Sequence, residues 1–287
     1  MSGFSADWLA QREAADSRAR SKALLATLPR QVSTIVDLGT GTGANLRWLA
    51  PQLGFAQHWT LVDNDSRLLT AARQAIVAWA EASGYRTSGS DSSFIVSGAT
   101  FDCRVTLLEL DLSKNLAGLE VPPGCLVTAS ALFDLVSLSW LEALVDRVAA
   151  SNASVLWALS YDGSVTFAPA LEDDDSIIDL VNRHQLTDKG FGPALGPNAW
   201  RVAQRLLEAA GLEVRTEDSS WRCAAADRAL LATLIEGWAD AAIAIAPADA
   251  DAIEQWCVQR QGLVANGQLE VTVGHRDLAA RPRIIRD

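Results

Sequence analysis

Two kinds of segment alternate along the chain. Short apolar runs, several of them rich in β-branched residues, begin at Thr34, His58, Cys103, Gly124 and Ser154. Longer segments with apolar residues at helical spacing follow most of these runs, and they predict helices over 66–82, 138–150 and 199–210. Strands that alternate with helices are typical of an α/β fold, in which helices cover a parallel sheet.

The two ends of the chain depart from this alternation. Residues 5–28 predict a helix that stops before the first proline. A loop rich in Gly, Ser and Thr is expected over 83–93, with a short strand at 94–96 after it. Near the C-terminus, 211–216 and 269–274 show the alternating pattern of strands and enclose a helical stretch rich in Ala, Leu and Trp.

We expect one domain over 1–287, because a chain of this length commonly forms a single α/β domain with additions. One addition is the N-terminal helical segment, 1–29. The other is an insertion over 163–198, which follows the strand-like run that begins at Ser154. Long insertions at the carboxyl side of a sheet often carry function, so this one is predicted to bind the substrate.

The strongest functional signal is a glycine-rich turn. The apolar run Thr34–Leu38 is followed by Gly39, Gly41 and Gly43, and then by a helical segment. Glycine permits positive φ and close approach of a ligand, and the helix N-terminus offers unpaired N–H groups. A second strand ends at Asp63, about 20 residues later, where α/β nucleotide-binding folds place an acid that binds ribose. The pattern predicts a nucleotide-like ligand.

With a further acid, Asp111, at the end of the next strand, these motifs resemble those of the class I S-adenosylmethionine (SAM)-dependent methyltransferases. The resemblance implies a doubly wound sheet of seven mostly parallel strands, with the last strand antiparallel, and SAM as the cofactor. It places the glycines under the methionine part of SAM, Asp63 at the ribose hydroxyls and Asp111 at the adenine. The residues expected to bind the cofactor are Asp37, Gly39, Thr40, Gly41, Gly43, Asn45, Asp63, Asn64, Asp111, Leu112 and Ser130.

The resemblance also implies transfer of a methyl group to an oxygen or nitrogen of a small-molecule acceptor. Two alternatives stay open. Gly39, Gly41 and Ala44 also satisfy the dinucleotide pattern Gly-x-Gly-x-x-Gly/Ala, which would indicate an NAD-dependent oxidoreductase. The other alternative is a protein that binds SAM without catalysing a reaction. Residues 128–134 lack the Asn/Asp-Pro-Pro-Tyr/Phe motif typical of enzymes that methylate amino groups of nucleic acids, so base methylation is disfavoured.

Candidate residues for the acceptor come from two places. The carboxyl ends of strands lie beside the ligand in such sheets, which suggests Phe133, Asp134 and Tyr161. The insertion offers two cations for an anionic substrate, Arg183 and Lys189. His184 is the leading candidate for a general base, because its reference pKa lies near neutrality.

Composition limits the partners. The formal net charge of -11 argues against a nucleic-acid backbone as the main partner. The four cysteines lack the spacing of a zinc site or a disulfide framework. The acidic run 172–175 is interpreted as the start of a helix, where carboxylates favour the positive dipole end, and no metal is predicted.

The sequence also bears on location. No basic and apolar signal peptide is found at the N-terminus, and the most apolar later run, 229–247, is too short and polar to span a membrane. A cytoplasmic protein without membrane partners is expected, and a homodimer is left open.

Overall fold

The structure is a computed structural model that describes residues 5–30 and 32–283. At its centre, five parallel strands lie side by side in the order β5, β2, β1, β6, β7. Their bounds are β1 Thr34–Leu38, β2 Phe55–Asp63, β5 Phe101–Glu109, β6 Leu126–Ser130 and β7 Ser154–Ala168. The predicted α/β class, with a parallel centre, is therefore confirmed.

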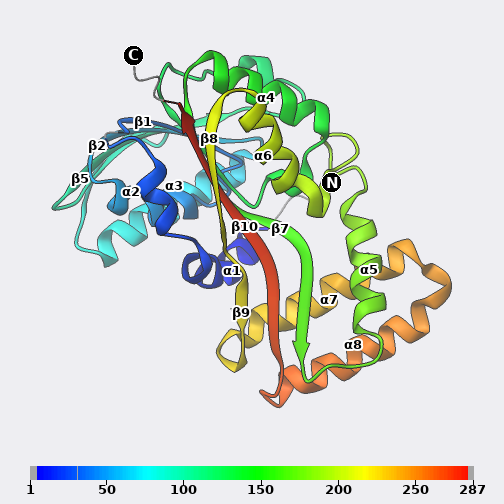
Figure 1. Ribbon diagram of the computed structural model, residues 1–287. Coiled ribbons are helices and arrows are strands. Elements are labelled where there is room, and N and C mark those ends of the chain that lie inside the picture. Colours follow the sequence, from blue (N-terminus) through cyan, green and yellow to red (C-terminus); the bar gives the residue numbers. More distant parts are fainter. Residues whose placement is uncertain (1–4, 31, 284–287) are drawn as a thin grey trace.

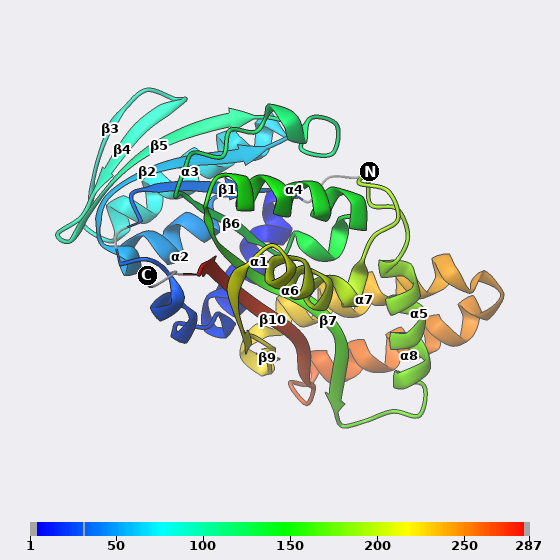
Figure 2. The same cartoon turned by 45° about the horizontal axis from the view of Figure 1, so that its top comes forward.

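Antiparallel strands extend this centre on both sides. The last strand, β10 (Glu270–Pro282), lies antiparallel between β7 and β8 (Leu212–Asp218), as the resemblance implied. On the other side, β3 (Arg86–Gly89) and β4 (Ser93–Ser97) form a hairpin beside β5, which Figure 2 shows at the far edge. The short strand β9 (Trp221–Cys223) also pairs with β10.

The sheet thus has ten strands, and the prediction of seven was wrong. The expected loop over 83–93 contains β3, all four of whose residues are exposed. Such a strand is held by backbone pairing at a solvated edge and has no apolar alternation to reveal it. With only three residues, β9 is too short to produce a recognisable pattern.

Helices cover both faces of the sheet (Figures 1 and 2). Neighbouring residues of β1 point to opposite faces: Ile35 packs in the core with α2 and α3, and Val36 in the core with α4 and α6. Because both faces are buried, the central strands are apolar without alternation. These helices are α2 Ala44–Leu53, α3 Ser66–Ala82, α4 Leu138–Ala150 and α6 Ala199–Ala209. The predicted starts of the last three are confirmed.

A third core lies where β7 and β10 run past the parallel strands (Figure 1). It is formed by α1 (Ala6–Ala19), α5 (Asp174–Gln185), α7 (Arg228–Ile245) and α8 (Ala250–Ala265). Inside it, the fully buried guanidinium of Arg260 pairs with the carboxylate of Asp174. Asp174 belongs to the acidic run, so this residue is held by an ion pair and not only by the helix dipole.

Two predicted boundaries change. The strand that begins at Ser154 was expected to end near 162, but it continues to Ala168 because its outer half pairs with β10. The N-terminal helix was expected over 5–28, but α1 ends at Ala19 and a 3-10 turn follows. The 3-10 turns are η1 Ala23–Thr27, η2 Leu116–Gly118, η3 Phe133–Leu135, η4 Gly196–Asn198, η5 Ala225–Asp227 and η6 Pro247–Asp249.

In the described residues, no helix combines the length and apolar character needed to cross a bilayer.

Candidate functional site

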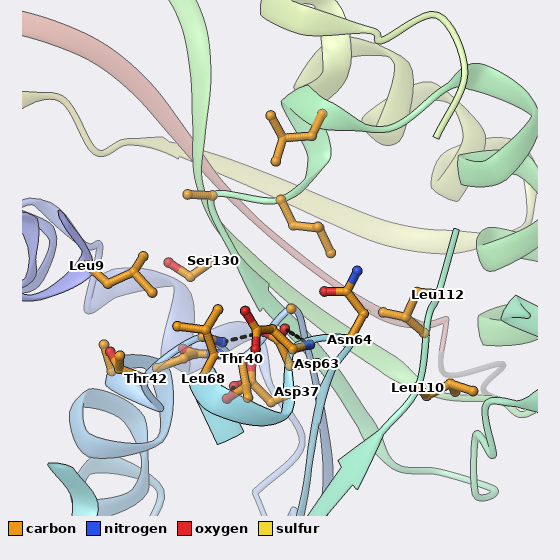
Figure 3. A pocket seen from close by; sticks show the side chains of 18 of the residues that line it. Leu9, Asp37, Thr40, Thr42, Asp63, Asn64, Leu68, Leu110, Leu112 and Ser130 are labelled. Atoms are coloured by element: carbon orange, nitrogen blue, oxygen red, sulfur yellow. Dashed lines mark hydrogen bonds between the residues drawn. The ribbon is translucent and has the colours of Figure 1, made fainter. Parts of the chain in front are cut away.

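A cavity of about 500 Å³ lies at the carboxyl ends of the parallel strands. Four strand ends contribute to it, together with α1 and the loop after α5 (Figure 3). This is the edge at which open α/β sheets bind ligands. Most of the residues predicted to bind a cofactor border it, namely Asp37, Gly39, Thr40, Gly41, Asn45, Asp63, Asn64, Asp111, Leu112 and Ser130.

The glycine turn adopts a backbone that other residues avoid. Gly39, Gly41 and Gly43 all have positive φ, between 54° and 74°. Gly43 caps α2 and does not border the cavity. A Cβ atom there would lie 2.9 Å from Cδ1 of Ile76, and one at Gly41 would lie 2.8 Å from Cδ1 of Leu9. Positive φ therefore favours glycine at these two positions, and any larger residue would also displace the end of the Ile76 or Leu9 side chain.

Asp37 supports the turn from below. Its side chain is fully buried, and its two carboxylate oxygens accept hydrogen bonds from Oγ1 of Thr40 at 2.6 Å and Nδ2 of Asn45 at 2.5 Å. Burial raises its pKa to about 6, against the effect of these hydrogen bonds. The side chains of Asp37 and Asn45 thus bind each other by a hydrogen bond, and their main contribution is to hold the turn.

Asp63 ends β2 directly beside the turn. Its Oδ2 atom accepts the N–H of Gly41 at 2.8 Å and its Oδ1 atom accepts the N–H of Asp65 at 3.1 Å. The residue is 7% exposed, and burial raises the pKa of its carboxyl group. A carboxylate offers about four acceptor positions, so Asp63 retains capacity for further donors. Figure 3 shows Asp63 between Thr40 and Asn64.

Asp111 is more committed to its own loop than Asp63 is. Its Oδ1 atom accepts from the N–H and the hydroxyl of Ser113, and Oδ2 accepts from Nζ of Lys114 at 2.7 Å. The hydrogen bond from Lys114 is the main cause of its lowered pKa. The neighbouring Leu112 is buried, and its carbonyl accepts Nε1–H of Trp140 at 2.7 Å. Asp111 therefore borders the cavity, but it mainly stabilises its own turn and has few acceptor positions left for a ligand.

Helix α1 forms a wall of the cavity, although the sequence analysis named no residue of this helix for the site. Leu9, Arg12 and Asp16 border the cavity from this helix. The helix is held in place by Glu13, whose carboxylate accepts from Nε and Nη2 of Arg47 on α2. Helical spacing indicated only that residues 5–28 have polar and apolar faces, because which face meets the glycine turn depends on packing.

The predicted acceptor residues at the strand ends do not border the cavity. Phe133 is 1% exposed, and its ring packs 4.1 Å from that of Trp157 in the core. Asp134 and Tyr161 are also buried, and atoms Oδ1 of Asp134 and Oη of Tyr161 have no hydrogen-bond partner. The 3-10 turn η3 directs neighbouring residues into the cavity instead, namely Ala131, Leu132 and Leu135. The expectation that Phe133, Asp134 and Tyr161 contact the substrate therefore does not fit this structure.

The insertion contributes two residues to the cavity wall, Lys189 and Phe191. His184 and Arg183 lie in the last turn of α5 and do not border the cavity. Nδ1 of His184 is 3.3 Å from Nζ of Lys189. Burial and then the charge of Lys189 lower the pKa of His184. A direct role of His184 as a base at the cavity has no support from this geometry.

A metal site is not evident at this edge of the sheet. Over residues 5–30 and 32–283, no group of three or more His, Cys, Asp or Glu side chains is arranged to hold an ion. The acids of the cavity instead accept hydrogen bonds from nearby N–H and O–H groups. Asp37 and Asp63 each accept two such hydrogen bonds, but Asp37 is fully buried whereas Asp63 is 7% exposed.

Comparison with known proteins finds similarity in structure only. No family model and no curated protein matches the sequence. A cyclopropane-fatty-acyl-phospholipid synthase-like protein from Lactobacillus casei superposes with a TM-score of 0.55 and 14% identity, over 98% of this chain and 95% of that one. The fold is of the class I methyltransferase type. The cyclopropane synthase MmaA2 from Mycobacterium tuberculosis gives a TM-score of 0.44 with 13% identity, over 90% of this chain and 82% of that one.

Proposed function

We propose that this protein is a SAM-dependent methyltransferase that transfers a methyl group to an oxygen or nitrogen of a small-molecule acceptor. The observation that carries the proposal is the position of Asp63. Its carboxylate lies at the cavity beside the glycine turn, and it keeps acceptor capacity beyond the N–H groups of its own loop, which include those of Gly41 and Asp65. Two adjacent ribose hydroxyls would match that capacity.

The rest of the cavity suits the other parts of SAM. Thr40 and Gly41 present backbone close to the ligand, which favours the methionine part. Leu110 and Leu112 form an apolar wall on the side away from Leu9 of α1, where the adenine ring would lie (Figure 3). Asp111 would accept a hydrogen bond from the adenine amino group only at an acceptor position that Ser113 and Lys114 do not already use.

When bound, SAM would supply an electrophilic methyl group on a sulfonium. The task of the protein is then to hold the acceptor in line with that methyl group and to exclude water, and orientation alone can lower a barrier by several kcal/mol. Leu9 from α1 and Phe191 from the insertion border the cavity with apolar side chains, which would help to exclude water from it.

The NAD-dependent alternative finds less support. A dinucleotide-binding sheet continues after its first half with further parallel strand and helix units. Here β8 and β9, the strands that follow β7, both pair antiparallel with β10. The chain between β9 and β10 forms the helix pair α7 and α8. The second alternative, a protein that binds SAM without turnover, shares the same cofactor site and differs only in catalysis.

Titration calorimetry with SAM and with NADH tests the proposal. SAM should bind and NADH should not. The variant Asp63→Ala should weaken SAM binding by about 1.5–3 kcal/mol, the range for hydrogen bonds to a charged group. Asp91→Ala is the matched control, because its carboxylate is fully exposed and distant in sequence from the cavity residues. Unchanged SAM affinity in Asp63→Ala would remove Asp63 from the site, and binding of NADH alone would favour the oxidoreductase.

A further inference from the structure

Three cationic side chains border the cavity, and two of them are already neutralised. Arg12 pairs with Asp16 at 3.0 Å, and Arg67 pairs with Asp65 at 2.8 Å. Lys189 has no carboxylate within 4.0 Å among the described residues. Its Nζ atom contacts only Oγ1 of Thr187 at 2.9 Å and Nδ1 of His184 at 3.3 Å. Lys189 is thus the cation at this cavity that lacks a carboxylate partner among the described residues.

The loop that carries Lys189 is firmly held. Oδ1 of Asp188 accepts the N–H groups of Gly190 at 2.6 Å and Gly192 at 3.0 Å. Phe191 forms a β-bridge with Val136, which joins the loop to the segment after β6. Lys189 is therefore positioned at the cavity by a defined backbone and not by a free surface chain.

The position of Lys189 disfavours the charged form of its side chain. The side chain is half-buried, and burial lowers its pKa. Partial burial disfavours an ammonium unless an anion lies next to it. The neighbouring His184 cannot provide that anion, since an imidazole is neutral or cationic and offers Lys189 at most one uncharged acceptor nitrogen. An anionic group on a ligand would supply the missing charge.

The wall next to Lys189 is apolar. Phe191 on the same loop borders the cavity, and the bridge between Phe191 and Val136 brings the turn after β6 beside it. That turn contributes Ala131, Leu132 and Leu135 to the cavity wall. The ring of Phe191 packs edge-on against Trp140 at 5.3 Å, which fixes its orientation. Such a wall favours the apolar body of a ligand through burial of its surface.

We infer that the acceptor is an amphipathic monoanion, a carboxylate attached to a small apolar body, with the carboxylate on Lys189 and the body against the wall of Leu132, Leu135 and Phe191. A single ammonium matches one negative charge. This inference deepens the proposed function, since it names the class of acceptor for the same cavity.

Octanoate and 1-octanol, which share an apolar body and differ in charge, serve as probes. Each is titrated by calorimetry into protein that has been saturated with S-adenosylhomocysteine. Octanoate should bind about tenfold or more tightly than octanol, and Lys189→Gln should remove that difference, while Lys189→Arg should retain it. Lys22→Gln is the matched control, because it removes the same charge from an exposed residue that does not border the cavity.

The results separate the two proposals. If S-adenosylhomocysteine does not bind in the first step, the proposed function fails. If it binds but octanoate and octanol bind equally, or octanoate does not bind, the inference about the acceptor is overturned. An equal effect of Lys189→Gln and Lys22→Gln would also overturn it, because the preference for an anion would then reflect overall charge.

Discussion

The two ends of the cavity are built in different ways. At the end near the glycine turn, polar groups follow directly after strands, and the acids are already held by hydrogen bonds, as in Asp37 with Thr40 and Asn45. At the other end, the turn after β6 and the loop after α5 meet, and they contribute Ala131, Leu132, Leu135 and Phe191 beside Lys189. Segments far apart in the sequence form this second end.

This difference between the two ends indicates which part of the cavity tolerates substitution. The first end depends on backbone geometry at the ends of β1 and β2, which the sheet itself imposes. The second end depends on how separate segments pack, so substitutions there should alter the acceptor while leaving the fold and the cofactor site intact. Three variants test this division.

The largest effect is expected from a change in the turn itself. Gly43→Val should lower the free energy of unfolding by about 4 kcal/mol, because a branched side chain is strained at φ +74° and overlaps Cδ1 of Ile76. Gly84→Val is the control, since Gly84 has φ +72° but no atom within 4 Å of its Cβ position. Denaturant unfolding measures both. Equal losses would show that only backbone strain matters and that the close contact with α3 does not.

A second variant concerns a buried acid near the other end. Burial raises the pKa of Asp134 from 3.8 to about 6, and its Oδ1 atom has no partner. Because the pKa is raised in the folded state, the stability that Asp134 contributes is fully present below about pH 4 and is lost as the pH rises through about 6. Asp134→Asn should therefore be more stable than the wild type near pH 7, by up to about 3 kcal/mol, and lose this advantage near pH 4.

Unfolding in denaturant at the two pH values measures this effect. Asp91→Asn, at an exposed position, should show no such dependence on pH. If Asp134→Asn were less stable than the wild type at both pH values, the carboxylate would have to be engaged in an interaction that this structure does not show.

The smallest effect is expected for His184. Because it contacts Lys189 but does not border the cavity, His184→Ala should leave the affinity for S-adenosylhomocysteine unchanged and alter octanoate affinity by about threefold or less. Calorimetry with both ligands measures this. A loss as large as that of Lys189→Gln would place the imidazole in the acceptor site.

Local patterns predicted the glycine-turn end well, because its residues follow one another in the sequence. An apolar run, three glycines and a helical segment define β1, the turn and α2, and Asp63 follows from the end of the next strand. The end of the cavity near Lys189 could not be predicted in this way. Phe133 and Asp134 lie in the correct segment, but they are buried in the core, and Leu132 and Leu135 border the cavity instead.

The amino-acid sequence by itself determined the α/β class, the parallel centre of the sheet and the glycine turn with Asp63 beside it, since strand periodicity, positive φ and strand ends are local properties. Tertiary structure alone decided the ten-stranded sheet, the helical core around Arg260 and the wall formed by Leu9, Lys189 and Phe191. The physical reason is that edge pairing through the backbone and contacts between distant segments leave no periodic signal along the chain.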